Sequence, residues 1–218
     1  RLPDFKVSNG DEPVTETEKI DNFSAVGSLS WLSSQTRPDL VCTTSFCQKR
    51  QSNPDKEALR TIVKGLKEAR KGALSGVWSR KHDGPIGLLV YHDAAFANTT
   101  GEVVDKDDPG LDDMLQAGEV YSQLGYLIFA VDLGVLSGKR GRATLLDWRS
   151  HTAKRVVRST FAAETMSCAE GLEAAILARS CLLEAERGDM DLHGELRDQI
   201  PILCVTDCKS LFDNLQRD

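Results

Sequence analysis

The stretch IGLLVYHDAAFA, residues 86–97, places an acidic residue inside an apolar run. Its segment 88–91 is short, apolar and rich in strand-forming residues, which is typical of a fully buried β-strand. Asp93 follows within the same run, and a carboxylate at the centre of a sheet stays ionised only if something compensates its charge. A divalent cation is the strongest such compensator, whereas a simple turn cap at the strand end is the alternative interpretation of Asp93.

A second apolar run ends in the same way, because residues 200–207 read IPILCVTD. Between the two runs, Glu164 lies on the apolar stripe of a long helix expected from Ser159 or Thr160 to about residue 186. The order strand-Asp, helix-Glu, strand-Asp is more specific than any one of its members. If the two strands are neighbours and the helix packs across them, Asp93, Glu164 and Asp207 meet at one point, and such a cluster needs cations to stay ionised.

The composition is that of a soluble globular protein, with room in 218 residues for one medium domain or two small ones. Residues 1–20 are polar and show no periodicity, which predicts a linker. Residues 21–82 show helical periodicity, and residues 85–218 show strands followed by a helix and a further strand. No apolar run is long enough to cross a bilayer, and the six cysteines form no Cys-x-x-Cys pair, which favours reduced core thiols.

Three helices are expected between residues 21 and 82. The first carries Phe23, Val26, Leu29 and Leu32 on one face, and the second begins near Pro38. The third is expected to start with Asn53 as N-cap and Pro54 at its first position, and to end at Gly72. This region has no group of residues typical of a catalytic site.

The remainder of the chain predicts an α/β fold with a mixed sheet and packed helices. Strands are expected at 86–97, 124–131 and 143–148, and their short or loop connections imply an antiparallel meander. Residues 98–119 form an acidic stretch without the spacing of a calcium loop, which indicates a solvated insertion. The helix after the meander is expected to face the sheet with these residues at helical spacing: Met166, Ala169, Leu172, Ile176 and Leu183.

Basic residues gather immediately before that helix, although the chain as a whole has a net charge of −6. They lie next to a helix N-terminus, which itself favours phosphate. The segment is therefore either a solvated loop or a surface that contacts phosphates. The candidate nucleic-acid-binding residues are Arg149, Lys154, Arg155, Arg158, Ser159 and Thr160.

The same motifs carry a resemblance to the Pol polyproteins of Ty1/copia-type retrotransposons, over the end of the reverse transcriptase and most of the ribonuclease H domain. The resemblance covers nearly all of the chain from residue 20. In the first part it rests on FSAVGSLSWL at 23–32, TRPDL at 36–40 and the KGLK helix segment at 64–67. In the second part it rests on HDA at 92–94, LGY at 124–126, Trp148, STFAAE at 159–164 and TD at 206–207.

What this resemblance implies is a ribonuclease H-like fold after a thumb or connection-like helical unit. Asp93, Glu164 and Asp207 would then be catalytic and hold two Mg2+ ions about 4 Å apart, with Mn2+ possible, one activating water and the other stabilising the leaving 3′-oxygen. The implied substrate is the RNA strand of an RNA/DNA hybrid, recognised through its 2′-hydroxyls. The implied partner is the rest of the Pol polyprotein, including the polymerase palm and fingers, in a cytoplasmic virus-like particle or in the nucleus and without a membrane.

The chain also departs from the family pattern. It has Ala95-Phe96 where the family usually has Asp-Trp, Thr165 where it has Tyr, and Cys208 where it has Asn. None of these changes removes a predicted metal ligand. The family places a fourth carboxylate beyond Asp218, so the ribonuclease H-like domain is expected to be incomplete at its C-terminus.

Two alternatives remain open at this stage. One is a catalytically inactive fragment that keeps the fold and still binds hybrids. The other is a strand transferase of the integrase type, which also uses two Asp and one Glu. A strand-transferase site places its Glu last, whereas Glu164 lies between the two aspartates in this chain.

Overall fold

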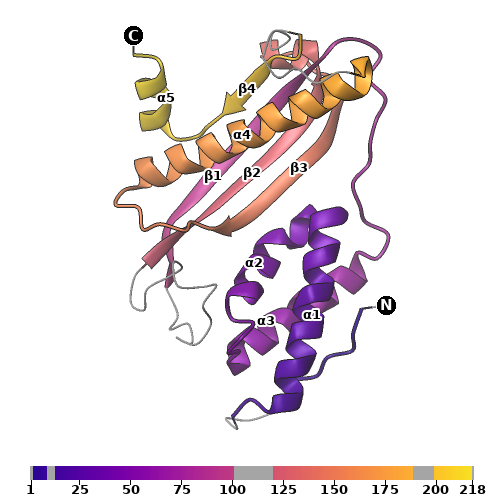
Figure 1. Ribbon diagram of the computed structural model, residues 1–218, viewed down its shortest axis with the longest axis vertical. Coiled ribbons are helices and arrows are strands. Elements are labelled where there is room, and N and C mark those ends of the chain that lie inside the picture. The colour runs from indigo at the N-terminus through magenta and orange to yellow at the C-terminus, as the bar shows by residue number, and fades with distance from the viewer. Residues whose placement is uncertain (1, 9–12, 101–119, 189–198, 218) are drawn as a thin grey trace. The chain divides into compact units, whose positions relative to one another are not determined.

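A computed structural model of the chain describes residues 2–8, 13–100, 120–188 and 199–217. The chain divides into two compact units, residues 1–77 and 78–218, of which the first is built from helices and the second from a sheet with packed helices (Figure 1). This confirms the predicted mixed α/β class. Most of the acidic stretch, residues 101–119, lies outside the described residues. Within the described ranges, no helix has the length and apolar content that a membrane span requires.

The first unit begins earlier than the sequence pattern predicts. Its helices are α1 (Glu16–Gln35), η1 (Pro38–Leu40), α2 (Val41–Lys49) and α3 (Lys56–Lys71). Thr15 caps α1 in a capping box with Glu18, so the helix starts inside the region expected to be a linker. Phe5 is buried in the helical core, and three neighbours in the first 20 residues pack against that core. The prediction of a linker over residues 1–20 is therefore wrong for residues 2–8 and 13–20, where apolar residues too sparse to form a periodic pattern are nevertheless buried.

A buried carboxylate fastens this N-terminal segment to the helices. Glu18 accepts hydrogen bonds from the backbone nitrogens of Thr15 at 2.9 Å and Ser8 at 3.0 Å, and Lys56 Nζ lies 3.0 Å from both of its oxygens. The Thr15 and Ser8 amides, followed by Lys56, hold the pKa of Glu18 well below its usual range. One side chain thus connects the segment before α1, α1 itself and the start of α3.

Two details of the helical predictions also change. The buried residues of α1 include Asn22, Val26 and Leu29, whereas Phe23 is 48% exposed and not on the core face. In α3 the N-cap is Asp55, whose side chain accepts from Ala58 N, rather than Asn53. Asp55 takes this role because the backbone N–H of Ala58, three residues later, has no partner within the first turn of the helix and can donate to the Asp55 carboxylate.

The second unit contains a four-stranded sheet in the order β3-β2-β1-β4. The strands are β1 (Ile86–Thr100), β2 (Val120–Asp132), β3 (Ala143–Thr152) and β4 (Ile202–Val205). β1 pairs antiparallel with β2, and β2 pairs antiparallel with β3, which confirms the predicted meander. β4 pairs parallel with β1. Asp93 lies well inside β1 rather than at its end, because β1 continues to pair with β2 beyond it.

The long helix α4 (Thr160–Arg187) lies across the sheet and contacts β1 and β2 (Figure 1). Its N-cap is Ser159, which is one of the two residues predicted for that position. The residues that it buries are mostly small, and they are Ala163, Glu164, Ser167, Gly171, Ala175 and Leu183. Of the predicted sheet-facing residues only Leu183 is fully buried. Leu172 and Ile176 are exposed, because the buried face of α4 follows positions 163, 167, 171 and 175, and each of these two residues lies one position beyond that face.

α4 packs closely against the sheet at Gly171. A Cβ at this position would lie 3.0 Å from Val90 Cγ1 and 3.2 Å from Tyr126 Cβ, and Val90 is fully buried. We therefore expect Gly171→Ala to lower the free energy of unfolding by about 1–3 kcal/mol through overpacking. This loss should outweigh the gain of roughly 1 kcal/mol that alanine brings to a helix.

Gly27→Ala is the matched control, because Gly27 lies in α1 and a Cβ added to it would meet nothing within 4 Å. Alanine there should raise stability by up to about 1 kcal/mol. Urea denaturation of the full chain, followed by circular dichroism, measures both changes. A Gly171→Ala protein as stable as the native chain would show that α4 does not depend on this contact.

Candidate metal centre

The parallel pairing of β1 and β4 brings two aspartates to the same level. Leu88 lies opposite Ile202, and the register continues unchanged to Tyr91 and Val205. Two residues further along, Asp93 in β1 and Asp207 just after β4 stand at corresponding positions. The expectation that the two acid-bearing strands are neighbours is confirmed.

α4 supplies the third carboxylate. Glu164 lies in the first turns of this helix, and its Oε1 accepts a hydrogen bond from Ala94 N at 3.4 Å. Three residues later, the buried Ser167 hydroxyl lies 2.9 Å from the carbonyl oxygen of Asp93 and 2.8 Å from that of Gly125. Ser167 therefore anchors α4 against β1 and β2 directly beside Asp93.

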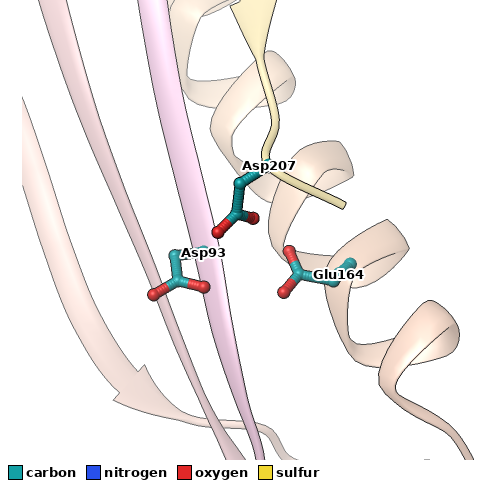
Figure 2. Close-up of side chains that lie close together, drawn as sticks. All are labelled: Asp93, Glu164 and Asp207. Carbon is teal, nitrogen blue, oxygen red and sulfur yellow. The ribbon is translucent and has the colours of Figure 1, made fainter. Parts of the chain in front are cut away.

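The three carboxylates converge, as Figure 2 shows. One oxygen from each of Asp93, Glu164 and Asp207 lies within 4.8 Å of the other two. The predicted meeting of these residues is confirmed, while their chemical roles stay predictions. Each comes from a different element, so the cluster exists only when β1, β4 and α4 are all in place.

The burial of the cluster differs from the expectation. Asp93 and Asp207 are exposed, and the buried acid is Glu164, which is only 4% exposed. Strand alternation explains the correction, because it places Val90, His92 and Ala94 in the buried layer and leaves Asp93 accessible. The costly carboxylate to bury is therefore on the helix and not on the strand.

The electrostatics of Glu164 favour a bound cation. Burial raises the pKa of its carboxyl, and the negative charges of Asp93 and Asp207 raise it further, against the opposing hydrogen bond from Ala94 N. Its Oε2 is buried and has no hydrogen-bond partner among the described residues. A buried carboxylate that lies close to two further carboxylates forms with them a donor set for a hard cation such as Mg2+ or Mn2+.

His92 is the residue of this site that the sequence analysis did not identify. Its Nδ1 lies 3.7 Å from Glu164 Oε2, and its side chain is fully buried. Burial lowers the pKa of His92, whereas Asp207 and Asp93 oppose that change. The sequence did contain a signal for it. Neighbouring side chains of a strand point to opposite faces, so an accessible Asp93 implies that His92, directly before it, is buried.

The predicted nucleic-acid-binding residues are exposed and belong to β3, to the connection that follows it and to the start of α4. Arg149 is in β3, and Lys154, Arg155 and Arg158 are in the connection from β3 to α4; all four side chains are exposed. The Ser159 hydroxyl accepts from Ala162 N at 3.1 Å as the helix cap, and Thr160 is the first residue of α4. This basic segment therefore leads directly into the helix that carries Glu164.

Compared with known protein families, with curated proteins and with solved structures, the chain matches none.

We expect Glu164→Gln to have opposite effects with and without divalent cations. Because the pKa of Glu164 is raised in the folded chain, the folded state binds that proton more tightly than the unfolded state. The ordinary pKa of a glutamate carboxyl is 4.5. In EDTA, as the pH rises above that value, the native chain should lose stability relative to the Glu164→Gln variant. At pH 7 the variant should then unfold a few degrees higher than the native chain, and in millimolar Mg2+ or Mn2+ the order should reverse.

Thermal unfolding at several pH values checks this expectation. Glu173→Gln is the control, because Glu173 is an exposed residue of the same helix and lies outside the carboxylate cluster. It should show neither the pH effect nor the cation effect. Equal responses of the two variants would mean that Glu164 has no special relation to a cation.

Proposed function

We propose that the chain is the ribonuclease H-type endonuclease segment of a retrotransposon Pol polyprotein and hydrolyses the RNA strand of RNA/DNA hybrids. The observation that carries this proposal is the convergence of Asp93, Glu164 and Asp207 within 4.8 Å. The order of the three acids along the chain supports it, because Glu164 lies between the two aspartates. A site of the strand-transferase type would have its Glu after both.

The architecture is compatible with a ribonuclease H-like fold. Three antiparallel strands precede α4, and β4 then returns parallel to the first of them. The helix between β3 and β4 packs on the sheet and bears the middle carboxylate of the series. The sequence motifs that resemble Ty1/copia-type Pol polyproteins contain all three acids, so the resemblance and the geometry point to the same residues.

The three carboxylates have different tasks in this proposal. Together they would hold two Mg2+ or Mn2+ ions, which would activate a water molecule and neutralise charge at the leaving oxygen. Asp93 and Asp207 are exposed and face an approaching phosphodiester, whereas the buried Glu164 holds the centre from the helix side. Hydrolysis breaks the bond between phosphorus and the 3′-oxygen, and it leaves a 3′-hydroxyl and a 5′-phosphate.

The exposed basic segment is the proposed substrate-binding surface. Lys154, Arg155 and Arg158 offer positive charge just before the N-terminus of α4, where Ser159 and Thr160 begin the helix, and Arg149 adds an exposed positive charge from β3. Specificity for the hybrid would come from the 2′-hydroxyls of the RNA strand. The helical unit is proposed to be thumb or connection-like, with the polymerase palm and fingers of the same Pol polyprotein as partners inside the cell.

We expect Mg2+-dependent cleavage of a labelled RNA strand in an RNA/DNA hybrid, and its loss in Asp93→Asn. The substitution removes one negative charge and one cation-binding oxygen while preserving the shape of the side chain. Double-stranded DNA and single-stranded RNA serve as substrates that should stay intact. Gel electrophoresis of the products at increasing Mg2+ concentration measures the activity.

Asp213→Asn is the matched control, because Asp213 is a partly exposed carboxylate of α5 (Lys209–Leu215) that pairs with Lys209 outside the cluster. It should cleave like the native chain. Hybrid binding without cleavage by the native chain would instead identify the inactive hybrid-binding fragment. Cleavage that persists in Asp93→Asn would reject the centre proposed here.

Replacing Lys154, Arg155 and Arg158 together by Gln should weaken hybrid binding and reduce its salt dependence. Each lost phosphate contact lowers the slope of log affinity against log salt by roughly 0.7–0.9. Fluorescence anisotropy of a labelled hybrid at several salt concentrations measures the slope. The control is Lys64→Gln with Lys67→Gln in α3, which removes two positive charges from the other unit. Unchanged slopes in the triple variant would show that the basic segment does not contact phosphates.

A further inference from the structure

The buried imidazole of His92 has no role in the function proposed above. Its side chain is fully buried, and neither ring nitrogen has a hydrogen-bond partner among the described residues. The nearest acidic oxygen is Glu164 Oε2, which is also buried and also lacks a partner. Two buried polar groups that face each other at 3.7 Å without a hydrogen bond each carry a desolvation cost.

We propose that His92 is a positioning residue of the carboxylate centre, and that its Nδ1–H holds the Glu164 carboxylate in its cation-binding orientation. This inference rests on the metal centre of the proposed function. The separation of 3.7 Å exceeds a hydrogen bond by a few tenths of an ångström. A small rotation of the Glu164 side chain closes this gap and gives the unpartnered Oε2 a hydrogen-bond donor.

The surroundings of His92 support a donor role toward Glu164. Its neighbour Asp93 is turned to the opposite side of β1, and the carboxylate that lies against the imidazole is that of Glu164. Glu164 Oε1 already accepts from Ala94 N, which leaves Oε2 for a second donor. Carboxylates and imidazoles that bind metals are commonly oriented by such outer partners, and loss of the partner typically lowers metal affinity by about 10–100-fold.

A second pair of the same kind provides an internal comparison. His151 in β3 faces Glu170 in α4, with Nε2 lying 3.1 Å from Oε2. This pair also joins a strand to α4, but Glu170 is outside the carboxylate cluster. Changes at His151 therefore report the structural cost of losing a histidine between the sheet and α4, without an effect on the centre.

The experiment measures Mn2+ binding by the full chain with calorimetry and with electron paramagnetic resonance, so it does not depend on cleavage. His92→Phe keeps a ring and removes both nitrogens. His92→Asn places an amide nitrogen near the position of Nδ1, whereas His92→Gln reaches toward the position of Nε2. His151→Phe is the matched control, and thermal unfolding of each variant records its stability.

We expect His92→Phe and His92→Gln to weaken Mn2+ binding by about tenfold or more, and His92→Asn to restore most of it. His151→Phe should leave Mn2+ binding unchanged. If His92→Phe does not fold, the proposal is tested by comparing the Mn2+ affinities of His92→Asn and His92→Gln. Equal affinity in all His92 variants, an equal loss in His151→Phe, or no Mn2+ binding by the native chain would overturn the proposal.

The outcome also separates this proposal from the proposed function. Native Mn2+ binding with the expected pattern of variants, but without cleavage of any hybrid, would reject the nuclease activity and leave the role of His92 intact. Cleavage by the native chain together with unaltered Mn2+ binding in His92→Phe would retain the nuclease and reject the positioning role.

Discussion

The parallel pairing of β4 with β1 is the constraint on which the candidate centre depends. Parallel neighbours cannot be joined by a tight turn, so the chain must cross over the sheet between them. In this protein α4 belongs to that crossover. The same connection that allows Asp207 to stand beside Asp93 also carries Glu164 across β1, and topology alone therefore brings three distant parts of the sequence together.

The depth at which α4 packs decides the chemistry of the site. Because Gly171 has no side chain, α4 packs closely against Val90 and Tyr126 at this point. The Ser167 hydroxyl donates to carbonyl oxygens of β1 and β2. This approach buries Glu164 against His92 while Asp93 stays accessible. A helix further from the sheet would leave all three carboxylates hydrated, and the need for a cation would be weaker.

The cluster opposes the stability of the second unit in the absence of a cation. Three carboxylates lie within 4.8 Å of one another, one of them buried with an unpartnered oxygen. Natural proteins tolerate such an arrangement mainly where it serves binding or catalysis, because the surrounding fold must supply the lost free energy. Here the supporting structure is the core of Leu88, Val90 and Ile128 beneath α4.

The sequence by itself determined the local elements and the residues of the cluster. The strand around Asp93, the cap at Ser159 and the strand before Asp207 are set by residues that are close in the chain, so their periodicity is readable. The burial of Phe5, the buried face of α4 and the contact of His92 with Glu164 were decided only by the tertiary structure. Small residues such as Gly171 leave no mark in a hydrophobic pattern, and a few scattered apolar residues form no period. How closely two elements pack depends on both partners, and the partner of α4 lies about 80 residues earlier in the chain.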